Sequence, residues 1–296
     1  MATAVRLAGQ PVSMPNCDNT SAIRTSISHS EYDFMGKAID IRDLCVSFPY
    51  DGGELEVLKN LSLQVREGEF LSILGPSGCG KSTLLRVLGG LLGFKSGSVL
   101  VGAETPDEAK KHRAFGFVFQ NPVLFSWRTV LENVLLPAEI FSAARNRNSF
   151  QERVDWRGAA HEMIDLVGLK GFENAYPGQL SGGMQSRVAI ARVLSYQPDV
   201  LAMDEPFGDL DELTRNRMNS ELIQLWESKR NTIVFVTHSI HEAIVLSDRV
   251  AVLSQRPSHV REMVEISLPR PREADIVSTA SYMDSMRKLR HALGVK

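Results

Sequence analysis

The chain has 296 residues, enough to bury a large core, and its 43% hydrophobic and 23% charged residues are typical of a globular protein. The 33 Lys and Arg residues are balanced by 35 Asp and Glu, so the net charge of −2 gives no general reason to expect a nucleic-acid partner. The sequence has no apolar run long enough to span a membrane and no signal-peptide pattern, which argues against a membrane-spanning or secreted protein. The three scattered cysteines, Cys17, Cys45 and Cys79, lack metal-ligand spacing and favour a reducing cytosol.

Residue patterns divide the chain into three parts. Residues 1–35 are rich in Ser, Thr, Ala and Asn and follow neither a helical nor a strand period, so we expect a flexible leader. Residues 36–268 alternate between strand and helix patterns and are expected to form one α/β domain. Within it, helical periods alone over about 127–195 indicate an inserted helical subdomain. A breaker with two prolines at residues 268–272 leads into residues 269–296, an expected helical tail.

Alternating apolar residues predict strands, and 3.6-residue periods predict helices, along the folded part. The expected strands are residues 38–44, 58–65, 69–74, 96–102, 115–120, 200–203, 232–236, 249–253 and 260–266. The expected helices are residues 84–88, 130–136, 159–167, 213–228 and 282–293, with one more opened by residues 180–185. The helix at 213–228 separates two strands, which is the pattern of a βαβ unit with parallel strands.

A turn is expected at residues 47–53, between the first two strands, and it holds two aromatic residues. Either Phe48 or Tyr50 could stack on an adenine ring, because every base offers a π-face. The alternative for each is an exposed aromatic side chain in a loop.

A phosphate loop is the most informative segment of the sequence. It consists of Gly75, Pro76, Ser77, Gly78, Cys79, Gly80, Lys81, Ser82 and Thr83. An expected strand precedes this G-x-x-x-x-G-K-[ST] motif and an expected helix follows it, as the motif requires. The glycines let successive N–H groups converge on a phosphate chain, Lys81 adds a charge for the β- and γ-phosphates, and the Ser82 hydroxyl can ligate Mg²⁺. Although a glycine-rich turn with a surface lysine is the alternative, the flanking elements predict binding of a nucleoside triphosphate.

Two acidic residues complement this loop. Asp204 and Glu205 follow the apolar strand at 200–203, so Asp204 is expected at the carboxyl end of a parallel strand, where nucleotide phosphates bind. Asp204 can hold Mg²⁺ directly or through water, and Glu205 can act as general base on an attacking water. The alternative is an acidic pair that caps a helix.

A second anion site is predicted at the start of another helix. Ser181, Gly182 and Gly183, followed by Gln185, present exposed amides at a helix N-terminus. Because one triphosphate does not need two such sites in one chain, we expect this segment to serve the γ-phosphate bound to another copy.

The chain resembles the ATP-binding subunit of ABC transporters over residues 39–270. The phosphate loop, Gln120, residues 180–185, Asp204-Glu205 and His238 occur in the order of that family. The resemblance implies an α/β fold with a P-loop NTPase core, an antiparallel β subdomain and an inserted α-helical subdomain, and it implies ATP and Mg²⁺ as cofactors. It also implies a dimer, most simply a homodimer, whose two subunits close head to tail around two ATP molecules.

The resemblance assigns roles to individual residues. Glu205 would be the hydrolytic base, and His238 would contact the γ-phosphate, although a buried core histidine is the alternative. Gln120 would reach both Mg²⁺ and the membrane partner, Asp211 would link the two ATP sites, and Tyr50 would stack on the adenine.

Finer features resemble the nitrate/sulfonate/taurine importer branch, namely residues 125–134, 176–180 and 204–208. This resemblance implies a peripheral ATPase on the cytoplasmic face of the inner membrane, bound to transmembrane permease subunits and served by a substrate-binding protein outside. The sequence departs from that branch at Ser186, Asp209, Ser239 and His241. A soluble ABC-type ATPase of DNA repair or translation is the alternative function, but the short interval between Lys81 and Asp204 leaves no room for the coiled coil of the repair ATPases. A P-loop kinase would leave residues 180–185 and His238 unexplained.

Overall fold

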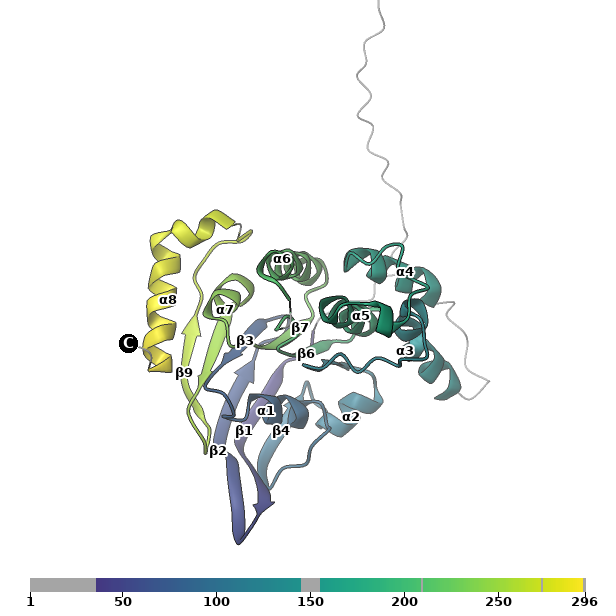
Figure 1. Ribbon diagram of the computed structural model, residues 1–296. Coiled ribbons are helices and arrows are strands. Elements are labelled where there is room, and N and C mark those ends of the chain that lie inside the picture. The colour runs from purple at the N-terminus through teal and green to yellow at the C-terminus, as the bar shows by residue number, and fades with distance from the viewer. Residues whose placement is uncertain (1–35, 145–154, 209, 273, 295–296) are drawn as a thin grey trace, which may run out of the picture. The chain divides into compact units, whose positions relative to one another are not determined.

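Two β-sheets with helices around them make up the fold (Figure 1). The computed structural model describes residues 36–144, 155–208, 210–272 and 274–294, and the predicted leader at 1–35 lies outside the described residues. The described residues all belong to one compact unit, to which the following description refers.

The larger sheet has six strands in the order β5-β6-β7-β3-β8-β9, and every neighbouring pair except β8-β9 is parallel. Its strands are β3 (Phe70–Leu74), β5 (Phe115–Val118), β6 (Val200–Asp204), β7 (Thr232–Val236), β8 (Arg249–Leu253) and β9 (Val260–Glu265). All residues of β3, β6 and β7 are buried, because helices and the smaller sheet cover both faces. These six strands confirm the expected ones, with ends that differ by up to two residues.

The smaller sheet is antiparallel and has the order β2-β1-β4, with strands β1 (Ile39–Tyr50), β2 (Gly53–Val65) and β4 (Ser96–Val101). The expected turn at 47–53 is wrong in extent, because strand pairing continues to Tyr50 opposite Gly53 and only two residues turn. β4 pairs with β1 no further than Cys45, which leaves one edge of the end of β1 free. Pro49 is tolerated at this free edge because it has no N–H to donate.

The helical subdomain lies between β5 and β6 in the chain, as expected. Its helices are α3 (Val130–Ala144), α4 (Trp156–Leu166) and α5 (Gly182–Leu194), which group together in Figure 1, and η1 (Pro177–Gln179) is a short 3₁₀ turn. Asn133 of α3 is fully buried and anchors the preceding segment: its side chain donates to the carbonyl oxygens of Phe125, Arg128 and Thr129 and accepts from the Phe125 amide. These bonds satisfy a buried amide and fix the connection from β5 to α3.

The remaining helices are α1 (Lys81–Leu88), α2 (Pro106–Lys111), α6 (Glu212–Lys229), α7 (Ile240–Leu246) and α8 (Ala280–Leu293), with a 3₁₀ turn η2 (Ala274–Ser278). The sequence did not predict α2 and α7. Both are short, so each presents too few apolar residues to establish a helical period.

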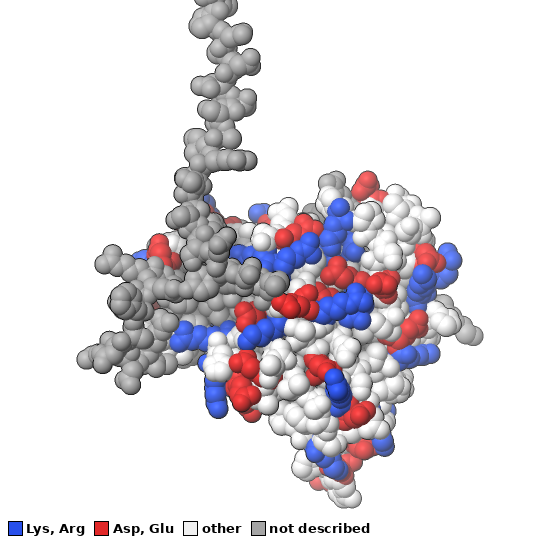
Figure 2. Space-filling model, turned by 180° about the vertical axis from the view of Figure 1, so that it is seen from behind, with Lys and Arg blue, Asp and Glu red and all other residues white. Residues whose placement is uncertain are grey.

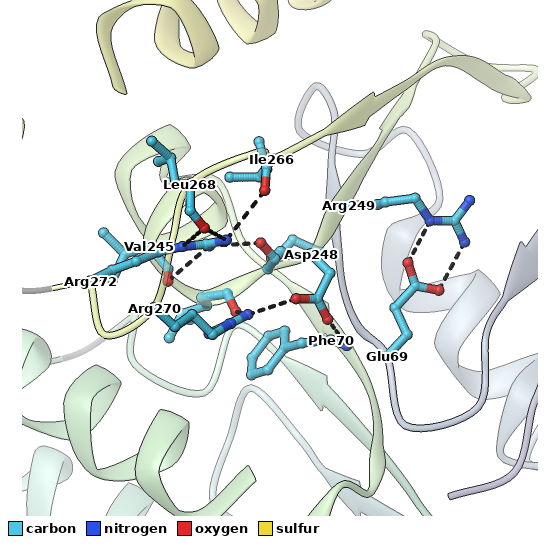
Figure 3. Close-up of polar contacts among 12 residues, drawn as sticks. Glu69, Phe70, Val245, Asp248, Arg249, Ile266, Leu268, Arg270 and Arg272 are labelled. Carbon is cyan, nitrogen blue, oxygen red and sulfur yellow. Dashed lines mark hydrogen bonds and ion pairs between the residues drawn. The ribbon is translucent and has the colours of Figure 1, made fainter. Parts of the chain in front are cut away.

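The C-terminal segment is held by arginine side chains (Figure 3). Arg270 binds Oδ1 of Asp248 at 3.0 Å, and Oδ2 of the same carboxylate accepts from the Phe70 amide of β3. Arg272 donates to the carbonyl oxygens of Ile244 at 2.6 Å and Ser247 at 2.7 Å, and further carbonyls surround it. The predicted breaker at 268–272 thus clamps the C-terminal end of α7, where the helix dipole favours positive charge. α8 then packs against α7 and β9.

The surface of the described residues in Figure 2 carries Lys and Arg side chains interspersed with Asp and Glu. Ion pairs among the described residues include Lys37 with Glu104 at 2.8 Å and Arg217 with Glu221 at 2.7 Å. Pairs this exposed contribute little to stability.

Candidate functional site

Four parallel strands end at the same edge of the larger sheet, and predicted site residues follow each of them. Asp204 at the end of β6 pairs with Val236 of β7, which in turn pairs with Ile73 of β3. Parallel strands in register place their carboxyl ends together. The residues that lie just beyond these ends are Gln120 after β5, Glu205 after β6, His238 after β7 and Gly75 after β3.

The phosphate loop joins β3 to α1, and its glycines are required by close approach. Gly80, directly before α1, has φ +112, and a Cβ there would lie 2.8 Å from Cγ1 of Val57 and 2.9 Å from Cδ2 of Leu58. Gly78 has φ +72, a conformation that L side chains rarely adopt. A side chain would therefore clash at Gly80 and strain the backbone at Gly78, while Ser77 at the tip of the loop is exposed.

The lysine of this loop is buried by its own backbone. Lys81 is 8% exposed, and its ammonium donates to the carbonyl oxygens of Gly75 at 2.9 Å and Pro76 at 3.1 Å. Cys79 is also buried, and burial raises the pKa of its thiol, although the positive charge of Lys81 acts in the opposite direction. A neutral thiol adds no negative charge to the loop that would offset the positive charge of Lys81.

The first turn of α1 reaches the end of β6. Ser82 donates a hydrogen bond of 3.1 Å to Oδ1 of Asp204, and Thr83 beside it is half-buried. Burial raises the pKa of the Asp204 carboxyl, and the Ser82 hydrogen bond lowers it. Two oxygen atoms of the kind that Mg²⁺ prefers thus lie side by side beneath the phosphate loop.

Glu205 and His238 contact each other. Oε2 of Glu205 lies 3.2 Å from Nδ1 of His238, and the His238 side chain is 63% exposed. The alternative of a buried core histidine is therefore wrong. Glu205 has φ +45, which is uncommon for a residue other than glycine. This backbone conformation occurs at the turn directly after β6. The alternative of a helix-capping acidic pair is also wrong, because Asp211 caps α6.

The second predicted anion site lies in the helical subdomain, at the start of α5. Ser181 caps this helix by accepting from the Met184 amide at 3.3 Å, and Gln185 donates to the carbonyl oxygen of Pro177 at 3.0 Å. Ser181 and Gly182 are exposed. A Cβ on Gly183 would lie 2.6 Å from Cδ2 of Leu210, so a side chain there would require the Leu210 side chain to shift. Among the described residues, these contacts tie the segment to its own surroundings, and none of them joins it to the phosphate loop of the same chain.

Three further predicted residues take separate positions. The Asp211 carboxylate accepts from the Thr214 amide at 3.0 Å and the Thr214 hydroxyl at 2.6 Å, and these bonds lower its pKa. Tyr50 is 70% exposed at the tip of the β1–β2 hairpin, whereas Phe48 packs against the core. Of the two aromatic candidates, Tyr50 is thus the free one. Gln120 is exposed directly after β5.

Sequence reasoning missed the residues that hold these loops, namely Arg215, Thr237 and Glu242. Thr237 precedes His238, and its hydroxyl donates to Glu242, which is 5% exposed. Glu242 lies on α7, and because the sequence did not predict this helix, burial of the Glu242 carboxylate could not be inferred either. The nearest signal in the sequence is the polar pair Thr237 and Ser239 around His238.

Comparison with known proteins identifies the family of the chain. The ABC transporter family description matches residues 58–208. The chain is 44% identical to the uncharacterized ABC transporter ATP-binding protein MJ0412 of Methanocaldococcus jannaschii, over 84% of this chain and 90% of that protein. It is 38% identical to the aliphatic sulfonates import ATP-binding protein SsuB of Bacillus cereus, over 85% of this chain and 94% of SsuB. It is 41% identical to the nitrate import ATP-binding protein NrtC of Synechococcus elongatus, over 80% of this chain and 35% of NrtC.

A solved structure of an ATP-binding cassette has a similar fold. The ATP-binding cassette MJ0796, as a dimer in a post-hydrolysis state bound to ADP and Pi, is similar with a TM-score of 0.69 and 34% identity, covering 78% of this chain and all of that one. Both sheets and the helical subdomain agree with the fold that the sequence predicted. The chain therefore belongs to the ABC transporter family, as one of its ATP-binding subunits with ATPase activity.

Proposed function

We propose that this ATPase powers the uptake of a small anion, such as nitrate, a sulfonate or taurine, by a membrane importer. The names of the sulfonate and nitrate relatives support an importer, and the importer-like segments at 125–134, 176–180 and 204–208 point the same way. The alternative, a soluble ABC-type ATPase of DNA repair or translation, has no comparable support. None of the described helices is long and apolar enough to cross a membrane.

The contact between Glu205 and His238, beside the phosphate loop, is the observation that carries the catalytic proposal. Lys81 and the loop amides hold the phosphate chain, and Tyr50 stacks on the adenine. Glu205 accepts the proton of a water molecule as its oxygen attacks the γ-phosphorus, and the bond from that phosphorus to the ADP oxygen breaks. His238, next to Glu205, hydrogen-bonds the γ-phosphate and keeps the base oriented.

Mg²⁺ fits the residues beneath the loop. Ser82 and Asp204 supply two neighbouring oxygen atoms, and Gln120 follows the adjacent strand. The described residues contain no cluster of three or more His, Cys, Asp or Glu side chains that could hold a metal ion by themselves. A site of this kind suits an ion that is bound mainly by the nucleotide phosphates, where it neutralises charge.

Two copies would complete the ATP sites. Ser181, Gly182 and Gly183 lie at the start of α5, and their contacts within the described part of the chain are with residues other than the phosphate loop. In a head-to-tail homodimer this helix N-terminus, with Gln185 behind it, faces the γ-phosphate held by the other copy. Asp211 begins α6 and would link the two sites. The dimeric MJ0796 cassette supports this arrangement.

The permease would dock beside Gln120, at the helical subdomain. A groove of about 310 Å³ lies between β5 and helices α3 and α5, and its lining is mostly apolar. The lining includes Phe115, Phe117, Phe119, Ile140, Phe141 and Tyr196. An apolar groove beside a site residue suits a cytoplasmic helix of a permease subunit. The ATPase would then lie peripherally at the cytoplasmic face of the inner membrane, with a substrate-binding protein outside.

Purification and transport assays test this function. The tagged chain, solubilised from its own membranes in mild detergent, should recover an integral membrane protein. Proteoliposomes of that complex with ATP at the nucleotide-binding side should take up labelled nitrate, taurine or an alkanesulfonate, and Glu205→Gln should abolish the uptake. Recovery of nucleic acid or ribosomes in place of a membrane protein would support the soluble alternative.

A further inference from the structure

An ion pair between a partly exposed arginine and a buried carboxylate joins α6 to α7. Nε of Arg215 lies 3.8 Å from Oε1 of Glu242, and the Glu242 side chain is 7% exposed. A carboxylate this deeply buried is costly unless it is paired and hydrogen-bonded. The hydrogen-bond partners of Glu242 and Arg215 therefore indicate which segments the ion pair holds in place.

Glu242 holds both neighbours of His238. The Thr237 hydroxyl donates to Oε2 of Glu242 and accepts from the Ser239 amide at 2.9 Å. The Ser239 hydroxyl in turn accepts from the Glu242 amide at 3.3 Å, which caps α7. The exposed His238 side chain thus projects from a backbone segment that is fixed on both sides. The buried Glu242 carboxylate holds Thr237 before it, and the Thr237 hydroxyl and the Glu242 amide hold Ser239 after it.

Arg215 holds the turn that follows Glu205. Its guanidinium donates to the carbonyl oxygens of Leu210 at 2.7 Å and Phe207 at 3.3 Å. Within this turn the Gly208 amide donates to the Glu205 carbonyl oxygen at 3.1 Å. Leu210 packs against Gly183 of the second anion site, so the same turn reaches α5.

We propose that Arg215 and Glu242 are positioning residues that couple the Glu205 turn to the His238 loop and so maintain the catalytic contact. The pair touches neither the phosphate loop nor Tyr50, so it acts on the chemical step and not on nucleotide affinity. The inference rests on the proposed roles of Glu205 and His238. It adds that these two residues keep their geometry because one Arg–Glu pair holds both of their loops.

Single substitutions measure the effect on catalysis. Arg215→Ala and Glu242→Ala should each lower kcat by about 10- to 100-fold, because displacing a catalytic group by about 1 Å costs that much. The Kd for ATP, measured by titration of a fluorescent ATP analogue, should stay within twofold. Glu242→Gln and Arg215→Lys, which keep part of the hydrogen bonding and remain folded more readily, should give smaller losses. Arg217→Ala is the matched control, because Arg217 lies on the same helix and its ion pair with Glu221 is away from both loops.

Double variants separate positioning from general support of the fold. Arg215→Ala with Glu242→Ala should lose no more activity than the worse single variant, because both act as one unit. In a Glu205→Gln background, Arg215→Ala should cause no further loss of kcat, because the group being positioned is already gone. Additive losses, an ATP affinity that falls in parallel with kcat, or wild-type kcat in both alanine variants would overturn the inference. High activity of Glu205→Gln by itself would instead refute the proposed role of Glu205.

Discussion

The Ser82 hydroxyl donates a hydrogen bond of 3.1 Å to Oδ1 of Asp204, although the two residues are 122 positions apart in the chain. The bond joins the first turn of α1 to the end of β6 and brings the two oxygen atoms of the proposed Mg²⁺ site together. It also supports a carboxylate that is 5% exposed and whose pKa burial raises.

Asp204→Asn is therefore expected to stabilise the free protein while it abolishes Mg²⁺-dependent hydrolysis. A raised pKa means that the folded state takes up a proton more readily than the unfolded chain, so the favourable contribution of Asp204 is lost as pH rises through the folded pKa. At neutral pH the ionised group costs stability, which asparagine avoids while it still accepts from Ser82. Thermal unfolding should show a higher Tm for the variant, by about 2–4 °C per kcal/mol. The gain should vanish at a pH below the unfolded pKa of an aspartate, and a Tm lower than that of the wild type at pH 7 would contradict the burial argument.

Glu205→Gln is expected to bind ATP normally but to lower kcat by about 10²- to 10⁴-fold, the usual contribution of a general base. Slow hydrolysis should trap a closed dimer in the presence of ATP, which size-exclusion chromatography would detect. Glu212→Gln, at an exposed position in the first turn of α6, is the matched control and should hydrolyse ATP at the wild-type rate. Normal turnover by a monomeric Glu205→Gln protein would contradict the assignment of the base.

Tyr50→Ala is expected to weaken ATP binding by about 5- to 150-fold, since stacking of an aromatic side chain on a base contributes about 1–3 kcal/mol. Tyr50→Phe should bind almost normally, because the ring is retained. Phe48→Ala should instead lower the Tm with little effect on affinity, because Phe48 packs against the core. Isothermal titration calorimetry with ATP compares the three variants, and an equal loss of affinity in Phe48→Ala would show that the hairpin as a whole, and not the Tyr50 ring, supports binding.

Arg272→Ala is expected to lower the free energy of unfolding by about 1–3 kcal/mol, because the buried carbonyl oxygens of Ile244 and Ser247 lose their charged donor. The protein should still bind ATP, since the phosphate loop does not contact this clamp. Urea denaturation followed by circular dichroism measures the change. Arg287→Ala on α8 removes an arginine that is 79% exposed, and its effect should stay within about 0.5 kcal/mol.

Much of the fold could be predicted from the sequence because its signals are local. Each buried strand is a short apolar run, and the phosphate loop lies between one such strand and a helix. The hydrophobic pattern and the phosphate-loop motif therefore predicted the same strand–loop–helix unit. The errors have local causes as well. The turn at 47–53 was too long because Pro49 and two glycines suggested irregular structure, while a free strand edge accommodated the proline. α7 was missed because its seven residues are too few to show a helical period.

By itself, the sequence determined that this protein is a nucleotide-binding α/β ATPase and which residue types face the phosphates, because phosphate binding depends on glycines, a lysine and a hydroxyl at fixed spacing. Only the tertiary structure decided which residues contact one another. Ser82 meets Asp204, and Glu205 meets His238, because parallel pairing of β3, β7 and β6 aligns the carboxyl ends of strands that lie far apart in the chain. The contact between Arg215 and the buried Glu242 carboxylate is of the same kind, since the proposed positioning role depends on burial of Glu242 and on two loops that lie apart in the sequence.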